Sequence, residues 1–175
     1  MTPGDVVLGI DPGTAVTGYG VVRLGARGAP ELIECGVIRT RADQRLSARL
    51  RDIHEGVSEL IARHSPSLLA VEDVFYARNV RTTVVLGHAR GVILLAGEMS
   101  GVSIVEYPPA VIKKTVVGRG AATKEQVQFM VAQLLRLKSP PQPADASDGV
   151  AAALCALLSP ALPSLASLTS SSRRP

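Results

Sequence analysis

The first apolar segment of the chain runs directly into a carboxylate, and this feature limits the possible folds more than any other. Residues 6–10 (Val-Val-Leu-Gly-Ile) form a short, continuous apolar run, which is typical of a buried strand. Asp11 follows the run, and Pro12-Gly13 ends the strand at that point. A strand of this kind belongs to a sheet covered on both faces, and it places its terminal acid at the edge of that sheet. The segment therefore predicts a layered architecture with acidic chemistry at one edge.

Four further segments have the composition of strands. They cover residues 17–23, 32–40, 68–72 and 102–106. Turns at residues 13–14 and 25–30 join the first three strands, so we expect the chain to open with an antiparallel meander. The strand at 68–72 is again continuous and apolar, and it again ends in an acid, Glu72.

Helical periodicity follows the meander. The predicted helices cover residues 44–64, 79–99, 108–115, 123–137 and 145–158. This order of elements predicts an α/β domain over residues 1–158, with a mixed five-stranded sheet and helices on both faces. Residues 159–175 are rich in Ser and Pro, and we expect them to form a disordered tail.

The predicted helix over residues 79–99 is apolar nearly all round. A helix of this kind is buried on more than one side. Two interpretations fit equally well: a central core helix, or a helix that also forms an interface with a second subunit.

Composition indicates where such a protein works. A hydrophobic content of 46% and a charged content of 19% favour a globular body. Cys35 and Cys155 match no metal or redox spacing, which suits a reducing compartment. The chain begins without a signal-peptide pattern, and no apolar run approaches the ~20 residues that span a bilayer. We therefore expect a cytoplasmic protein with no membrane partner.

Basic side chains are concentrated in the middle of the chain. Residues 1–77 carry 8 basic and 10 acidic side chains, whereas residues 78–138 carry 9 basic and 3 acidic ones. A basic segment predicts a surface for a polyanion, although ordinary solubilising charge explains the count equally well.

Four carboxylates stand at the ends of apolar segments: Asp11, Glu72, Asp145 and Asp148. Asp145 and Asp148 are three residues apart at a helix start, so they share one face. Simpler explanations exist for two of the four, because Asp11 suits a turn before Pro-Gly and Asp145 is a preferred helix cap. Glu72 has no such explanation, since a carboxylate that ends a buried strand is costly unless it is paired.

Carboxylates gathered in one place repel one another, and divalent cations relieve that repulsion. Ligation by oxygen alone suits Mg²⁺ or Mn²⁺, and no cluster of histidines or thiolates argues for zinc. Two such ions can activate water and stabilise the leaving oxygen of a phosphodiester. The four acids therefore predict a nuclease, provided that the fold brings them together.

Six motifs together resemble the RuvC family of bacterial Holliday-junction resolvases. They are residues 9–14 (GIDPGT), 17–20 (TGYG), 71–75 (VEDVF), 86–91 (LGHARG), 114–118 (KTVVG) and 144–148 (ADASD). The motifs occur in the family's order and spacing, and the resemblance covers roughly residues 6 to 158. Ser is common in the family at the position of Thr14, which is a mild difference.

The resemblance implies a ribonuclease-H-like fold and a homodimer that resolves four-way DNA junctions by symmetric paired nicks in recombination and repair. It implies that Asp11, Glu72, Asp145 and Asp148 are the catalytic, metal-binding acids, with Mg²⁺ or Mn²⁺ as the cofactor and two ions in each active site. It also implies work with the RuvA–RuvB branch-migration complex. Among the DNA contacts, it assigns base stacking to Phe75 and contacts with DNA to Lys113 and Lys124.

The residues themselves extend this DNA-binding set. The complete predicted set is Phe75, Arg78, Asn79, Arg81, Lys113, Lys114, Arg119 and Lys124. Phe75, with Tyr76 beside it, lies in a polar loop, whereas Phe129 lies on a helix stripe and is the better candidate for the core. For any single lysine a solvated side chain is the more ordinary explanation, and Asn79 suits a helix cap.

Three alternatives remain open. An actin-like kinase or ATPase shares the pattern around Asp11, but such proteins need a second lobe that this length does not supply. A YqgF-like nuclease of the same fold would act on RNA. A junction-binding protein without activity would not need all four acids.

Overall fold

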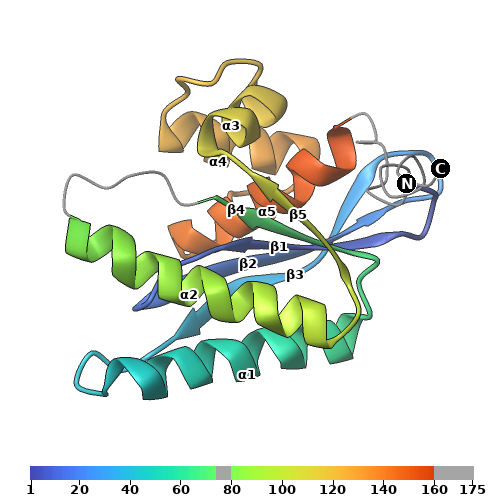
Figure 1. Ribbon diagram of the computed structural model, residues 1–175. Coiled ribbons are helices and arrows are strands. Elements are labelled where there is room, and N and C mark those ends of the chain that lie inside the picture. The colour runs from blue at the N-terminus through green and yellow to red at the C-terminus, as the bar shows by residue number, and fades with distance from the viewer. Residues whose placement is uncertain (74–79, 160–175) are drawn as a thin grey trace, which may run out of the picture.

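The computed structural model describes residues 1–73 and 80–159, and its order of elements is that predicted from the sequence (Figure 1). The strands are β1 (Val6–Asp11), β2 (Val16–Leu24), β3 (Pro30–Arg39), β4 (Leu68–Glu72) and β5 (Ser103–Tyr107). The helices are α1 (Leu46–His64), α2 (Val80–Met99), α3 (Pro109–Val117), α4 (Lys124–Leu134) and α5 (Ala144–Leu158).

The strands form one mixed sheet in the order β3-β2-β1-β4-β5. β1 pairs with β2, and β2 with β3, in antiparallel fashion, which confirms the predicted meander. β1 pairs with β4, and β4 with β5, in parallel. Because of these directions, β1, β3, β4 and β5 all end at the same edge of the sheet.

Helices cover both faces of the sheet, as predicted (Figure 1). α5 lies directly on one face, and α3 and α4 pack outside it. α1 and α2 cover the other face. Alternation along the strands divides the core accordingly: Val7 faces the α5 side, whereas Leu8 and Ile10 face the α1–α2 side.

Glycines let α5 approach the sheet unusually closely. A Cβ placed at Gly149 of α5 would lie 2.5 Å from the Cα of Tyr19 in β2. A Cβ at Gly18 would collide with the backbone carbonyl of Asp145, and one at Gly9 with the backbone of α5. The TGYG motif therefore has a packing role, since it lets the start of α5 contact the strands backbone to backbone.

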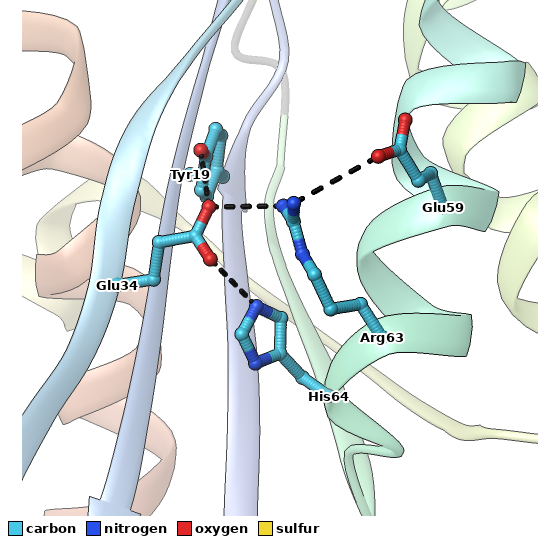
Figure 2. A network of polar contacts seen from close by, with 5 residues as sticks. All are labelled: Tyr19, Glu34, Glu59, Arg63 and His64. Carbon is cyan, nitrogen blue, oxygen red and sulfur yellow. Dashed lines mark hydrogen bonds and ion pairs between the residues drawn. The ribbon is translucent and has the colours of Figure 1, made fainter.

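A polar network ties the end of α1 to the sheet (Figure 2). Tyr19 and Arg63 both donate to Oε1 of Glu34, at 2.8 and 2.9 Å, and His64 Nε2 lies 2.8 Å from Oε2. Burial raises the pKa of Glu34, but the hydrogen bonds from Tyr19 and His64 and the charge of Arg63 outweigh it and lower that pKa overall. The network fixes the packing of α1 on β2 and β3.

The expectation that Phe129 lies in the core was wrong, and the burial of α2 on a second side is not seen within one subunit. Phe129 is 59% exposed on α4, because the buried stripe of that helix runs through Val127 and Val131 instead. α2 is buried along one side only, and four of its apolar side chains lie in solvent: Val80, Val84, Leu95 and Met99. Contacts with the core therefore bury one side of α2. Among the described residues nothing covers the other side, so the interface interpretation stays a prediction.

Two smaller features complete the comparison with the sequence. α4 begins with the predicted capping box between Thr123 and Gln126 but ends at Leu134, three residues earlier than predicted.

None of the helices in residues 1–73 and 80–159 has the length and apolar character that a bilayer crossing requires.

Candidate active site

Asp11 ends β1 at the edge where the parallel strands also end. The turn that follows is held locally, because the buried hydroxyl of Thr17 donates to the carbonyl of Gly13 at 2.6 Å. Thr40 donates to the carbonyl of Thr14, and Arg49 Nε donates to the Thr40 hydroxyl at 2.9 Å. Hydrogen bonds from the end of β3 and from α1 therefore hold the turn after Asp11 in place.

Asp145 and Asp148 approach Asp11 from α5. Carboxylate oxygens of the three residues lie within 4.8 Å of one another. The helix begins after Pro143, so Asp145 lies in its first turn and is not the cap, which excludes the simpler explanation of that residue. The close packing of α5 through Gly18 and Gly149 produces this gathering, because it brings the first turns of the helix onto β1 and β2.

Glu72 ends β4, the parallel neighbour of β1, and borders the same cleft. The cleft has a volume of about 170 Å³. Its lining combines three acids, two lysines and an apolar floor: Asp11, Glu72, Asp148, Lys113, Lys124, Pro109, Ile112, Val127 and Ala151. All four predicted acids thus meet at one edge of the sheet, three of them in direct proximity and Glu72 beside them.

The electrostatics of the cleft favour protonation of Asp11 and Glu72 when no cation is bound. Burial, together with the nearby charges of Glu72, Asp148 and Asp145, raises the pKa of Asp11 to about 8. Burial also raises the pKa of Glu72 to about 7, with a further contribution from Asp148. Lys124 opposes both shifts, and Lys113 opposes the second.

Lys124 is the counter-charge closest to the acids. Its Nζ lies 3.0 Å from Oδ2 of Asp148, whose side chain is only 14% exposed. The hydrogen bond and the charge of Asp148 raise the pKa of Lys124, so this amine stays cationic. Among the described residues, Asp148 is the only one of the four acids that forms an ion pair with a lysine.

The donor set fits hard divalent cations. Carboxylate oxygens are the ligands that Mg²⁺, Mn²⁺ and Ca²⁺ prefer. No histidine or cysteine is among the described residues that line the cleft, and the chemistry of the site therefore does not favour zinc.

The predicted DNA-binding residues divide into three groups. Lys113 and Lys124 line the cleft, whereas Lys114 and Arg119 are exposed beside it on α3 and on the loop that follows. Arg81 is exposed in the first turn of α2. Phe75, Arg78 and Asn79, like Tyr76, lie outside the residues that the structure describes.

Sequence reasoning missed a contact that holds the chain next to Glu72. Arg90 of α2 lies between two acids, with its Nε 3.4 Å from Oδ1 of Asp73 and a second nitrogen paired with Glu106 of β5. The backbone N–H of Asp73 also donates to the carbonyl of Tyr107 at 2.9 Å. The available signal was Arg90 itself, a cation within the apolar stretch 84–97 of α2.

Comparisons with known proteins agree along nearly the whole described chain. A family model described as crossover junction endodeoxyribonuclease RuvC matches residues 7–156. A protein of that name from Desulforamulus reducens is 45% identical over 151 residues, which is 86% of this chain and 91% of the relative.

Two solved structures are also similar. The structure of Thermus thermophilus RuvC superposes with a TM-score of 0.81 at 33% identity and covers 94% of this chain and 96% of its own. The same protein in complex with a Holliday junction substrate gives a TM-score of 0.78 at 33% identity, covering 86% of this chain and 91% of its own.

Proposed function

Because the chain belongs to the RuvC family of crossover junction endodeoxyribonucleases, we propose that it resolves four-way DNA junctions by hydrolysing phosphodiester bonds, in recombination and repair. One observation carries the proposal: Asp11, Asp145 and Asp148 converge, with Glu72 beside them, in one basic-rimmed cleft. The relative crystallised with a Holliday junction substrate supports the choice of substrate.

This proposal is favoured over the three alternatives for specific reasons. All four acids are present and gathered, which a binding protein without activity would not need. The described residues form a single sheet, whereas an actin-like kinase needs two lobes. The family match names a DNA-junction enzyme and therefore favours DNA over RNA as the substrate.

We assign metal binding to Asp11, Glu72, Asp145 and Asp148. Bound divalent ions, which we propose to be two Mg²⁺ or Mn²⁺, would supply Lewis acidity for activating water and for stabilising the leaving oxygen. Lys113 and Lys124 stand at the rim of the cleft, where their charges stabilise the phosphate as negative charge develops on it. The apolar floor at Ile112, Val127 and Ala151 limits water around the acids.

We further propose that Phe75, Arg78, Asn79, Arg81, Lys114 and Arg119 extend the DNA contact. Paired nicks need two active sites, so we propose a homodimer that forms through the exposed apolar side of α2. The family resemblance supports work with the RuvA–RuvB complex in the cytoplasm. We propose residues 1–158 as the nuclease domain.

A gel assay tests the function directly. The substrates are a synthetic four-way junction and a linear duplex of the same sequence, each with Mg²⁺, Mn²⁺ or a chelator. We expect paired, symmetric nicks on the junction only, and only with metal. Binding without cutting in every metal would support a protein without activity, and equal cutting of both substrates would indicate a general nuclease.

Replacing Asp11 with Asn tests the assigned chemistry. The variant should lose cutting by at least about a thousandfold, because its amide cannot replace an anionic ligand, while junction binding persists. A gel-shift assay in the presence of chelator measures the binding. Undiminished cutting by Asp11→Asn would contradict the assignment.

A further inference from the structure

The last residue of β3 lies on the same edge of the sheet as the active site. Gly18 of β2 pairs with Asp11 on one side and with Val37 of β3 on the other, and Arg39 lies two residues beyond Val37. With strands about 4.8 Å apart and a rise of about 3.4 Å per residue, the Cα atoms of Arg39 and Asp11 are roughly 12 Å apart.

Arg39 also belongs to the face of the sheet that carries α5. Cys35 packs into the core on the α5 side, and Ile38 packs into the core on the α1–α2 side. Alternation along β3 therefore places Arg39 on the same side as Cys35. This is the side from which α5 supplies Asp145 and Asp148 to the cleft.

Two more arginines follow Arg39 in the chain, at the start of α1, which covers the other face of the sheet. Arg45 is the residue before the first turn of α1, and Arg49 follows it one turn later. Arg49 Nε donates to the hydroxyl of Thr40, a neutral partner that leaves the arginine charge uncompensated. We call Arg39, Arg45 and Arg49 the β3–α1 arginine cluster.

The cluster lacks the carboxylate partners that neighbouring arginines have. Arg41 pairs with Asp43, and Arg51 pairs with Asp52. Across residues 1–73 and 80–159, Arg39, Arg45 and Arg49 form no ion pair. The first turn of α1 also contains no acid, although cations there oppose the helix dipole.

We propose that the β3–α1 arginine cluster binds backbone phosphates of a junction arm that extends from the cleft across the end of β3. Three uncompensated cations at one edge provide the charge that a phosphate backbone neutralises. The Cα atoms of Arg39 and Asp11 are roughly 12 Å apart, which is about the width of one DNA major groove. One duplex can therefore contact both sites. This inference rests on the proposed function, since it concerns the same substrate.

The test is the salt dependence of junction binding by Arg39→Gln/Arg45→Gln, measured in the presence of chelator. Loss of two phosphate contacts should reduce the slope of log K against log salt by about 1.8. If electrostatic contacts vanish near 1 M salt, that slope corresponds to roughly 60-fold weaker binding at 0.1 M. Cutting at saturating junction with Mg²⁺ should keep its rate, because neither residue lines the cleft.

The matched control is Arg27→Gln/Lys138→Gln, which removes the same charge. Arg27 is exposed in the turn between β2 and β3 at the opposite edge, and Lys138 is exposed beyond the end of α4 that is remote from Lys124. The control should change the slope by less than half as much. Equal slopes for the two double variants would overturn the inference even if the wild type cuts junctions.

A second measurement locates the contact and separates the two possible failures. Single methylphosphonates placed along each arm remove one phosphate charge at a time, and those that Arg39 contacts should weaken wild-type binding but not binding by Arg39→Gln. If the effects of the methylphosphonate and of Arg39→Gln on binding add fully at every position, the inference is also overturned. Absence of junction binding by the wild type would instead overturn the proposed function itself.

Discussion

Asp11 and Glu72 make the metal-free protein less stable as pH rises. Their pKa values are 3.8 and 4.5 as free groups and rise to about 8 and about 7 in the folded protein. Between these limits the folded state holds protons that the unfolded state has released. The free energy of unfolding contributed by this site therefore falls from about pH 4 to pH 8.

Asp11→Asn should accordingly stabilise the protein at pH 8 in the presence of chelator, by on the order of a few kcal/mol. At pH 4 the advantage should disappear, because Asp11 is then protonated in the folded wild type. Urea unfolding at both pH values measures the difference, with Asp43→Asn at an exposed position as the control. A stabilisation that does not change with pH would contradict the raised pKa of Asp11.

Individual site residues could be predicted to different extents. The gathering of the acids could be predicted because each stands where an apolar segment ends or begins, and the cost of an unpaired Glu72 indicated a partner. Arg39 could not be recognised as part of a basic surface, because residues 1–77, in which it lies, carry 8 basic and 10 acidic side chains when they are counted along the sequence. Only strand pairing shows that Arg39 and Asp11 share an edge.

The contact between α5 and the sheet decides whether the acids meet. Gly149→Ala should push the helix away from Tyr19, since the added Cβ would lie 2.5 Å from backbone that cannot move aside. We expect a loss of several kcal/mol in stability and loss of cutting. Thermal unfolding and the junction assay measure the two effects.

Gly87→Ala is the matched control for this helix substitution. Gly87 lies on α2, and a Cβ there meets nothing within 4 Å. Alanine should therefore stabilise α2 by about 0.5–1 kcal/mol. A fully active and stable Gly149→Ala would mean that the close packing of α5 is not required.

The elements themselves were largely predictable, and their packing was not. Short apolar runs identified the strands, and apolar residues at a spacing of three and four identified the helices, to within a few residues in the part of the chain that the structure describes. Phe129 was misjudged, because a helix stripe does not show which side of the helix meets the core. The approach of Gly149 to Tyr19 depends on where α5 lies in space, which no local pattern records.

At the level of the whole molecule, the uncovered side of α2 predicts a dimer. Val84 is 53% exposed on that side of α2. Val84→Glu should yield monomers, because a dimer interface there would have to bury the carboxylate of the new glutamate. Light scattering measures the mass in solution. Phe129→Glu, exposed on a helix of the opposite layer, should leave the mass unchanged, and an unchanged mass for Val84→Glu as well would contradict this interface.

The distance along the chain between the acids has a consequence for the cell. Asp11 is synthesised before Asp145 and Asp148, the acids that we propose bind metal with it, and they follow 134 and 137 residues later. At 5–20 residues per second, the ribosome takes about 7 to 27 s to reach them. A nascent chain therefore lacks part of the proposed set of metal ligands, and we expect the ability to break DNA to arise only when folding is finished.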